Sequence, residues 1–329
     1  MVYLSPDGEL NRVPFEALVD TRGRYLIERY RFAYLTSGAE LLEPKPEPAR
    51  GTVIFAAPDF DLGVRRRRAE ADTLLAAVAA HGSSSLRPES AAYRGTRSGE
   101  VPGWQGWVAL PGTRQEAAHV ERELAGSTYG PVQVYQGREA LEEVFEGMRA
   151  PRLLHVATHG YFFPDQELRG STDGIGPEQQ LARIRGTENP LLRSGLVLAG
   201  ANAVGAETDS LGVDDGWLTA EEIGLLNLQG TELVVLSACE TGLGEVRLGE
   251  GVSGLPRAFR YAGARTLVMS LFLVEDQATQ ELMGRFYRRL KAGHGKLEAL
   301  RGAQLEMMRR KGGAHPFYWA SFVLVGDPE

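Results

Sequence analysis

The 329-residue sequence contains a single cysteine, Cys239. One thiol excludes an internal disulfide, and it also excludes the zinc and iron–sulfur sites that require several cysteine ligands. Histidine offers no alternative, because His81, His119, His294 and His315 lack the spacing of metal ligands. We therefore expect no metal or other cofactor. A lone thiol is typical of a reducing compartment, which favours a cytoplasmic protein.

Long apolar runs and an excess of basic charge are also missing. No stretch approaches the roughly 20 apolar residues of a membrane-spanning helix, and the first residues lack a signal-peptide pattern. The formal net charge of −7 argues against direct nucleic-acid binding, since phosphate contacts need a basic face. The one basic run, at 64–72, leads into acidic residues and is typical of a solvated helix start. Neither a membrane nor a nucleic acid is therefore expected as a partner.

Strands and helices of ordinary length alternate along most of the chain. Continuous apolar runs predict strands that are buried on both faces, and apolar residues at helical spacing predict amphipathic helices. Such alternation is typical of an α/β protein whose mostly parallel sheet has helices on both faces. The expected strands are 52–60, 131–137, 152–160, 232–238, 265–272 and 317–326. The expected helices are 66–81, 112–126, 138–148, 252–262, 277–291 and 296–311.

The N-terminal segment and two loops stand apart from this alternation. Residues 1–50 combine short apolar runs with turn signals such as Asp7–Gly8, which predicts a small antiparallel β segment packed on the α/β domain at 51–329. Polar, glycine-rich composition predicts mobile loops at about 82–107 and 164–217. Because the first residues already have a strand-and-turn pattern, we expect the chain to be part of a longer multidomain protein.

Three of the expected strands end, at their C-terminal tips, in polar residues that could take part in a reaction: His159, Cys239 and Asp276. In open α/β sheets, ligands bind at the carboxyl ends of the strands. If these strands are neighbours, an imidazole, a thiol and a carboxylate converge there. A cysteine nucleophile needs an adjacent imidazole to take its proton and later to protonate the leaving amine. The backbone N–H groups of Gly160 and Cys239 could then form an oxyanion hole.

Each of these residues also has an ordinary structural explanation. A single cysteine at a strand end is more often a small buried hydrophobic residue than a nucleophile. A lone histidine is more often structural than catalytic. Their joint placement at strand ends makes the two explanations about equally good from the pattern alone.

Several long motifs occur in order over nearly the whole chain. They are DGELNRVPFEAL, LPGTRQEA, LLHVATHG, NPLLRSGLVLAGAN, LTAEEIGLLNLQG, LVVLSACETGLGE, GEGVSGLPRAFRYAGARTLVMSL and HPFYWASFVLVGDP. Together they resemble the CHAT domain family, which are caspase-like proteases often fused to tetratricopeptide repeats. In the wider clan, with caspases, separase, legumain and gingipains, a His-Gly pair and a cysteine stand on adjacent strand ends. The resemblance therefore implies a caspase-like fold with His159 as catalytic base and Cys239 as nucleophile. It leaves His155 as a strand residue that faces the core or a neighbour.

The acidic residues near these strand ends are open to two interpretations. Asp276 is well suited to cap the helix that follows it. Its position also resembles that of the acidic residue that holds a P1 arginine in separase, and a partly buried carboxylate would select Arg or Lys at P1. Glu275 is the alternative pocket acid. Asp59 is a weaker candidate that could equally be a Pro-Asp turn residue.

The resemblance implies a cysteine endopeptidase that cleaves a specific partner protein. Family members are typically held inactive until an attached sensor or repeat domain receives a signal, often in bacterial defence. A caspase-like module that binds a peptide without cutting it is the alternative, and a non-proteolytic thiol hydrolase or transferase is a third possibility. The presence of both His159 and Cys239 argues against the binding module.

Overall fold

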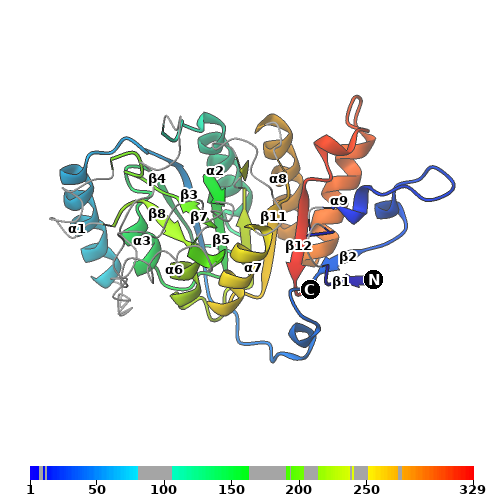
Figure 1. The fold of residues 1–329 in the computed structure, drawn as a ribbon, viewed down its shortest axis with the longest axis horizontal. Helices are drawn as coiled ribbons and strands as arrows, with labels where there is room; N and C mark the ends of the chain where they lie inside the picture. Colours follow the sequence, from blue (N-terminus) through cyan, green and yellow to red (C-terminus); the bar gives the residue numbers. More distant parts are fainter. Residues whose placement is uncertain are drawn as a thin grey trace, which may run out of the picture.

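The computed structural model of the protein describes residues 1–6, 10–11, 13–80, 106–162, 190–192, 194–203, 214–237, 239–240, 251–272 and 276–329. Within these ranges the chain forms a large central sheet, helices on both of its faces and a smaller second sheet (Figure 1). The predicted turn at Asp7–Gly8 lies outside the described residues, as does most of each predicted loop.

Eight strands form the central sheet, in the order β1-β2-β12-β11-β9-β5-β3-β4. Figure 1 shows this order running from β4 on the left to β12, β2 and β1 on the right. Every pairing described in it is parallel except that of β11 with β12. The prediction of a mostly parallel sheet is therefore confirmed. The strands are β1 Val2–Leu4, β2 Phe32–Tyr34, β3 Thr52–Pro58, β4 Val132–Gly137, β5 Leu153–Ala157, β9 Leu233–Leu236, β11 Thr266–Ser270 and β12 Phe322–Gly326.

Helices cover both faces of the central sheet, as the alternating pattern predicts. In every strand of this sheet except β1, alternate side chains enter two separate apolar cores, one on each face. The first core is shared with α1 Val64–Ala80, α3 Glu142–Gly147, α6 Ala220–Leu225 and α7 Gly251–Tyr261. The second is shared with α2 Pro111–Leu124, α8 Asp276–Lys291 and α9 Lys296–Arg309.

A second sheet, which the sequence analysis did not predict, has the order β10-β6-β7-β8. Within it β6 and β7, and also β7 and β8, are antiparallel, whereas β10 and β6 are parallel. The part of the predicted loop 164–217 that the structure describes is therefore largely regular, because it contains β7 and the start of β8. The strands are β6 His159–Phe162, β7 Ser194–Val197, β8 Trp217–Thr219 and β10 Cys239–Glu240.

Two strands that look continuous in the sequence are each divided between the two sheets. The run at 152–160 ends as β5 at Ala157 and starts again as β6, and the run at 232–238 ends as β9 before β10. At the first break, the hydroxyl of Thr158 donates a hydrogen bond to the carbonyl of Val197 in the second sheet, at 2.5 Å. The buried Thr158 thus ties the chain to its new partner strand at the point where it leaves the central sheet.

The predicted antiparallel pairing within residues 1–50 is wrong for the two strands of that segment. β1 pairs with β2 in parallel, and β2 in turn pairs with β12, so both belong to the edge of the central sheet. The connection between them contains two short 3-10 helices, η2 Phe15–Ala17 and η3 Leu26–Glu28, which form a crossover instead of a tight hairpin. In the described part of this segment, antiparallel pairing occurs as an isolated bridge between Val19 and Tyr25, outside the two strands.

A buried carboxyl group fixes this crossover to β2. The hydroxyl of Tyr34 donates a hydrogen bond to the Glu16 carboxylate at 2.8 Å and accepts one from the backbone N–H of Phe15 at 3.0 Å. Burial raises the pKa of Glu16 to about 7, and the hydrogen bond from Tyr34 offsets this only in part. The contact that holds the N-terminal segment is therefore sensitive to pH.

We expect Glu16→Gln to change how stability depends on pH. A carboxyl group with a raised pKa in the folded state contributes its full stabilisation below the ordinary value of 4.5, and that contribution is lost as the pH rises through about 7. Relative to the variant, the wild-type free energy of unfolding should therefore fall by about 3 kcal/mol between about pH 4.5 and about pH 8. Urea unfolding at a series of pH values measures it. The exposed Glu121→Gln serves as control, and an equal pH dependence of wild type and Glu16→Gln would contradict the prediction.

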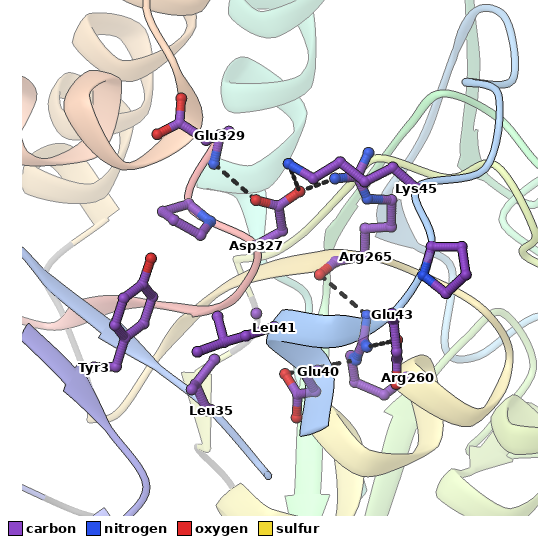
Figure 2. A pocket seen from close by; sticks show the side chains of 13 residues that line it. Tyr3, Leu35, Glu40, Leu41, Glu43, Lys45, Arg260, Arg265, Asp327 and Glu329 are labelled. Atoms are coloured by element: carbon purple, nitrogen blue, oxygen red, sulfur yellow. Dashed lines mark hydrogen bonds and ion pairs between the residues drawn. The ribbon is translucent and has the colours of Figure 1, made fainter. Parts of the chain in front are cut away.

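The chain after β2 is held against the C-terminal residues by ion pairs. The charged side chains line a cavity of about 180 Å³. Figure 2 shows them from close by. The ammonium group of Lys45 lies 3.2 Å from the Asp327 carboxylate, which also pairs with Arg265, and Arg260 pairs with Glu43. Because Gly326 at the end of β12 pairs with Thr266 at the start of β11, these ion pairs lie near the amino end of β11, away from the edge where the candidate residues follow the strands.

Candidate active site

The strands that precede the candidate residues are neighbours in the central sheet. β5 pairs with β9, and β9 pairs with β11, in both cases in parallel. His159 follows β5, Cys239 follows β9, and Asp276 is the first residue of α8 after β11. The chain thus brings all three positions to one edge of the sheet, where the sequence analysis expected a site.

The second sheet places the histidine and the cysteine directly opposite each other. β10 pairs with β6 in parallel, with Cys239 opposite His159 and Glu240 opposite Gly160. Neighbouring strands lie about 4.8 Å apart, so the two backbones are as close as a sheet allows. For Cys239, the structure describes the backbone and its pairing with His159.

His159 is buried, and its ring is held by contacts on two sides. It is 1% exposed, and its ring centroid lies 5.3 Å from that of Phe60 and 5.2 Å from the indole of Trp107. Its Nε2 lies 2.8 Å from the carbonyl oxygen of Val108. A carbonyl can only accept, so Nε2 carries the proton and Nδ1 is the basic nitrogen of the neutral ring.

The electrostatics of the site favour the neutral form of this histidine. Burial lowers the pKa of His159, and the hydrogen bond to Val108 opposes the effect without cancelling it. The imidazole is therefore unprotonated at neutral pH, which is the state that a general base requires.

Phe60 reaches the imidazole through a distortion at the end of β3. The pairing of β3 with β4 shifts between Ala56 and Pro58, and Ala57 between them has a φ of 45°, in the left-handed region. The hydroxyl of Thr113 accepts a hydrogen bond from the Ala57 N–H at 3.1 Å, which stabilises this conformation. Local strain of this kind is common beside functional sites.

Sequence reasoning missed the residues that surround His159. Phe60, Trp107 and Trp217 belong to one small aromatic core, together with Tyr161, Val197 and Ala201. Trp107 lies at the end of a segment predicted to be a mobile loop, and Val108 binds through its backbone carbonyl, for which no sequence signal exists. A tryptophan in a polar, glycine-rich stretch is the signal that could have identified the first of them.

The remaining predicted site residues differ in how far the structure describes them. Gly160 is buried in β6, between β10 and β7. Asp59 is exposed at the end of β3, the strand beside β5. Glu275 lies outside the described residues, and so does the side chain of Asp276. The choice between a helix cap and a substrate-binding role for Asp276 therefore stays a prediction.

Comparison with known proteins identifies the family. The sequence model of the CHAT domain matches residues 1–327. The chain belongs to the CHAT domain family. Tetratricopeptide repeat protein 28 of Mus musculus is 29% identical to this CHAT domain over 223 residues, which is 67% of this chain and 9% of the mouse protein. The Homo sapiens protein of the same name is 30% identical over 224 residues, with the same shares. The chain thus spans about a tenth of the length of these curated relatives.

Among solved structures, this CHAT domain is similar to the Arg-specific cysteine proteinase gingipain R (RgpB). The TM-score is 0.43 and the sequence identity is 10%, over 91% of this chain and 54% of the proteinase chain. The family match and the parallel sheet between two helix layers agree with the caspase-like α/β fold expected from the sequence.

The other histidine of the LLHVATHG motif lies in the core of the CHAT domain, as expected. His155 is fully buried on β5, with Nδ1 at 2.8 Å from the hydroxyl of Tyr287 on α8 and Nε2 at 3.3 Å from the Glu116 carboxylate on α2. It joins two helices to the sheet and does not reach the edge where His159 lies. His155 is therefore structural.

Two features are absent from the ranges that the structure describes, a cluster of metal ligands and a membrane-spanning helix. Within these ranges, no three acidic, histidine or cysteine side chains gather as metal ligands would. Among the helices in those ranges, none combines the length and the hydrophobicity that crossing a membrane needs.

Proposed function

We propose that this CHAT domain is a cysteine endopeptidase that cleaves a specific partner protein through His159 and Cys239. One observation carries the proposal: β6 and β10 begin with these two residues, directly opposite each other. The membership of the chain in a caspase-like protease family supports it.

The chemistry follows from the tautomer of His159. Nδ1 accepts the thiol proton, and the Cys239 thiolate attacks the carbonyl carbon of the scissile peptide bond. The oxyanion is stabilised by the backbone N–H groups of Gly160 and Cys239. Nδ1 then donates its proton to the leaving amine, which leaves a thioester. Water attacks this thioester with His159 again as the base, and the carboxylic acid product leaves as the thiol is restored.

The Val108 carbonyl has a defined part in this cycle. It keeps a proton on Nε2 throughout, so that Nδ1 is the nitrogen that exchanges protons with the thiol and the amine. It also accepts a hydrogen bond from the imidazolium that forms after the first proton transfer, which stabilises that charged state. Phe60 and Trp107 hold the ring in the plane that this exchange requires.

Acidic residues at the same edge of the sheet favour a basic side chain at P1. Asp276 begins α8 beside the site, Glu275 precedes it, and Asp59 is exposed at the end of the strand next to β5. A carboxylate in a partly buried pocket binds a guanidinium or ammonium group through charge-assisted hydrogen bonds. Asp276 is the first candidate because it follows the strand adjacent to that of Cys239.

Regulation is proposed to come from outside the domain. The curated relatives are named as tetratricopeptide repeat proteins and are far longer than this chain, which supports an attached repeat or sensor domain. The lone thiol supports a cytoplasmic setting. The resemblance described above supports a role in bacterial defence.

A library of quenched fluorescent peptides that differ at P1 tests the proposal. We expect wild type to cleave peptides with Arg or Lys at P1, and Asp276→Asn to reduce the preference for Arg over Met by about 10-fold or more. The exposed Asp72→Asn on α1 is the matched control. An unchanged preference for Arg over Met in Asp276→Asn would indicate that Asp276 serves the start of α8 and does not bind the P1 side chain. If peptides bind but none is cleaved, the result would contradict the endopeptidase and indicate a binding module. If product masses show acyl transfer to a nucleophile other than water, the result would indicate a transferase.

A further inference from the structure

Two consecutive residues hold the imidazole of His159. The Trp107 ring lies against it, and the carbonyl of Val108 accepts a hydrogen bond from its Nε2 at 2.8 Å. Because both contacts come from one short segment, the position of that segment determines the tautomer of the ring and, together with Phe60, its orientation. This segment follows a polar, glycine-rich stretch of sequence, so other parts of the protein must fix its position.

The side-chain amide of Asn202 binds both backbone groups of Trp107. Its Oδ1 accepts a hydrogen bond from the Trp107 N–H at 2.8 Å, and its Nδ2 donates one to the Trp107 carbonyl at 3.0 Å. The second hydrogen of Nδ2 goes to the carboxylate of Asp61, at 2.8 Å. Asn202 thus pairs with the backbone of Trp107 as a neighbouring strand would. Because the Asp61 carboxylate can only accept, it fixes the amide orientation in which Nδ2 and not Oδ1 faces Asp61.

The backbone of Asn202 is fixed to the same rigid region. Its N–H donates to the carbonyl of Phe60 at 2.9 Å, and the carbonyl of Ala201 accepts from the Trp217 indole at 2.9 Å. On the other side, Gly106 has a φ of 94°, and a Cβ there would lie 3.1 Å from Oδ1 of Asn202. The backbone of Asn202 is therefore fixed, and its side-chain amide has little room on the side of Gly106.

From this geometry we infer that Asn202 is a positioning residue for His159, which it orients through the backbone of Trp107 and Val108. The catalytic meaning of this role rests on the proposed function, whereas the orientation itself does not. The site needs one acceptor and one donor from a short planar group, and only an asparagine side chain supplies both at this length. Aspartate has the same shape, but its second oxygen would face the Trp107 carbonyl and the Asp61 carboxylate, and both contacts would become repulsive.

Nitrogen NMR of histidine-labelled protein tests the orientation without any substrate. In wild type we expect His159, assigned by its absence in His159→Gln, to be the tautomer with the proton on Nε2. In Asn202→Asp we expect the signals of a mixture of tautomers, because the Val108 carbonyl no longer holds its position. Asn227→Asp is the matched control, since Asn227 uses its oxygen as an acceptor at an exposed turn and aspartate can do the same.

Kinetics with the best peptide of the library test the consequence for catalysis. We expect Asn202→Asp to lower kcat by about 10–100-fold and to leave KM within about twofold, because the change affects proton transfer and leaves peptide contacts intact. Gly106→Ala is the second variant, for use if Asn202→Asp does not fold. Its added Cβ would lie 3.1 Å from Oδ1 of Asn202 and would displace the same amide. This variant should cause the same change in tautomer.

The outcomes separate this inference from the proposed function. An unchanged His159 tautomer in both folded variants would overturn the positioning role, whatever the activity of wild type. A mixed tautomer in the variants of a protein that cleaves no peptide would support the positioning role while refuting the endopeptidase. A mixed tautomer with unchanged kcat would overturn the claim that this orientation matters for catalysis.

Discussion

Cys239→Ala is expected to abolish peptide hydrolysis, and His159→Gln is expected to lower kcat/KM by about 10³-fold or more. The first change removes the atom that forms the thioester, and the second removes the group that deprotonates the thiol and protonates the amine. Glutamine is close to histidine in size, so it can fill the space between Phe60 and Trp107 without a large cavity. The losses should therefore appear in activity and leave the fold intact.

Steady-state cleavage of the best library peptide, together with thermal unfolding, measures both effects. His294→Gln is the matched control, since His294 is exposed in the turn after α8, and its kcat/KM should stay within about twofold of wild type. Turnover that survives in both Cys239→Ala and His159→Gln would end the protease interpretation. An equal loss in His294→Gln would show that the effect is not specific to the site.

Arg67→Met is expected to destabilise the fold by about 3–5 kcal/mol. The guanidinium of Arg67 is 2% exposed, and it lies 3.4 Å from the Glu142 carboxylate and 3.2 Å from the Glu143 carboxylate, which are equally buried. Burial raises the pKa of Glu142 well above its ordinary value, and Arg67 acts in the opposite direction. Without the arginine, these two buried carboxylates would lose the guanidinium that lies beside both of them. These glutamates also bind the backbone just before β8, since Glu142 accepts a hydrogen bond from the Gly216 N–H at 2.7 Å.

Urea unfolding at neutral pH measures this effect. Arg68→Met is the matched control, because the neighbouring Arg68 is half exposed and pairs with Asp72 one turn away, a contact worth about 0.5 kcal/mol or less. Adding Glu142→Gln to Arg67→Met should recover part of the loss, because one uncompensated charge is removed. A cost below about 1 kcal/mol for Arg67→Met would show that the glutamates are stable in the interior without it.

The sequence pattern predicted those features that depend on local chemistry. The helical spacing of Ala140, Leu141, Val144, Phe145 and Met148 predicts a common face, and all five side chains are buried in and around α3. The spacing of Thr219 and Glu222 in the LTAEE motif predicts a capping box, which is present at the start of α6. The side chain of its threonine accepts a hydrogen bond from the third helical N–H of α6, and its glutamate accepts the N–H of the threonine. In each case, residues a few positions apart contain the whole interaction.

Features that depend on pairing between distant strands could not be predicted in this way. The apolar pattern continues through Thr158, so it gives no sign that the chain changes sheets there. That change depends on β7, which lies within a predicted loop and becomes the partner of β6. The candidate pair at His159 and Cys239 was predicted because the ends of apolar runs can be read from the sequence. Its surroundings were missed because a backbone carbonyl, such as that of Val108, looks the same in every sequence.

The pH dependence of Cys239 alkylation by iodoacetamide, in wild type and in His159→Gln, tests the central claim most directly. Cys239 is the only cysteine, so the mass increase reports on this thiol alone. If His159 takes the thiol proton, wild type should react at about pH 6 at least ~10-fold faster than the variant, whose rate should follow a free thiol with a pKa of about 8.5. Identical rates in the two proteins across the pH range would show that the imidazole and the thiol do not act together, and would contradict the proposed dyad.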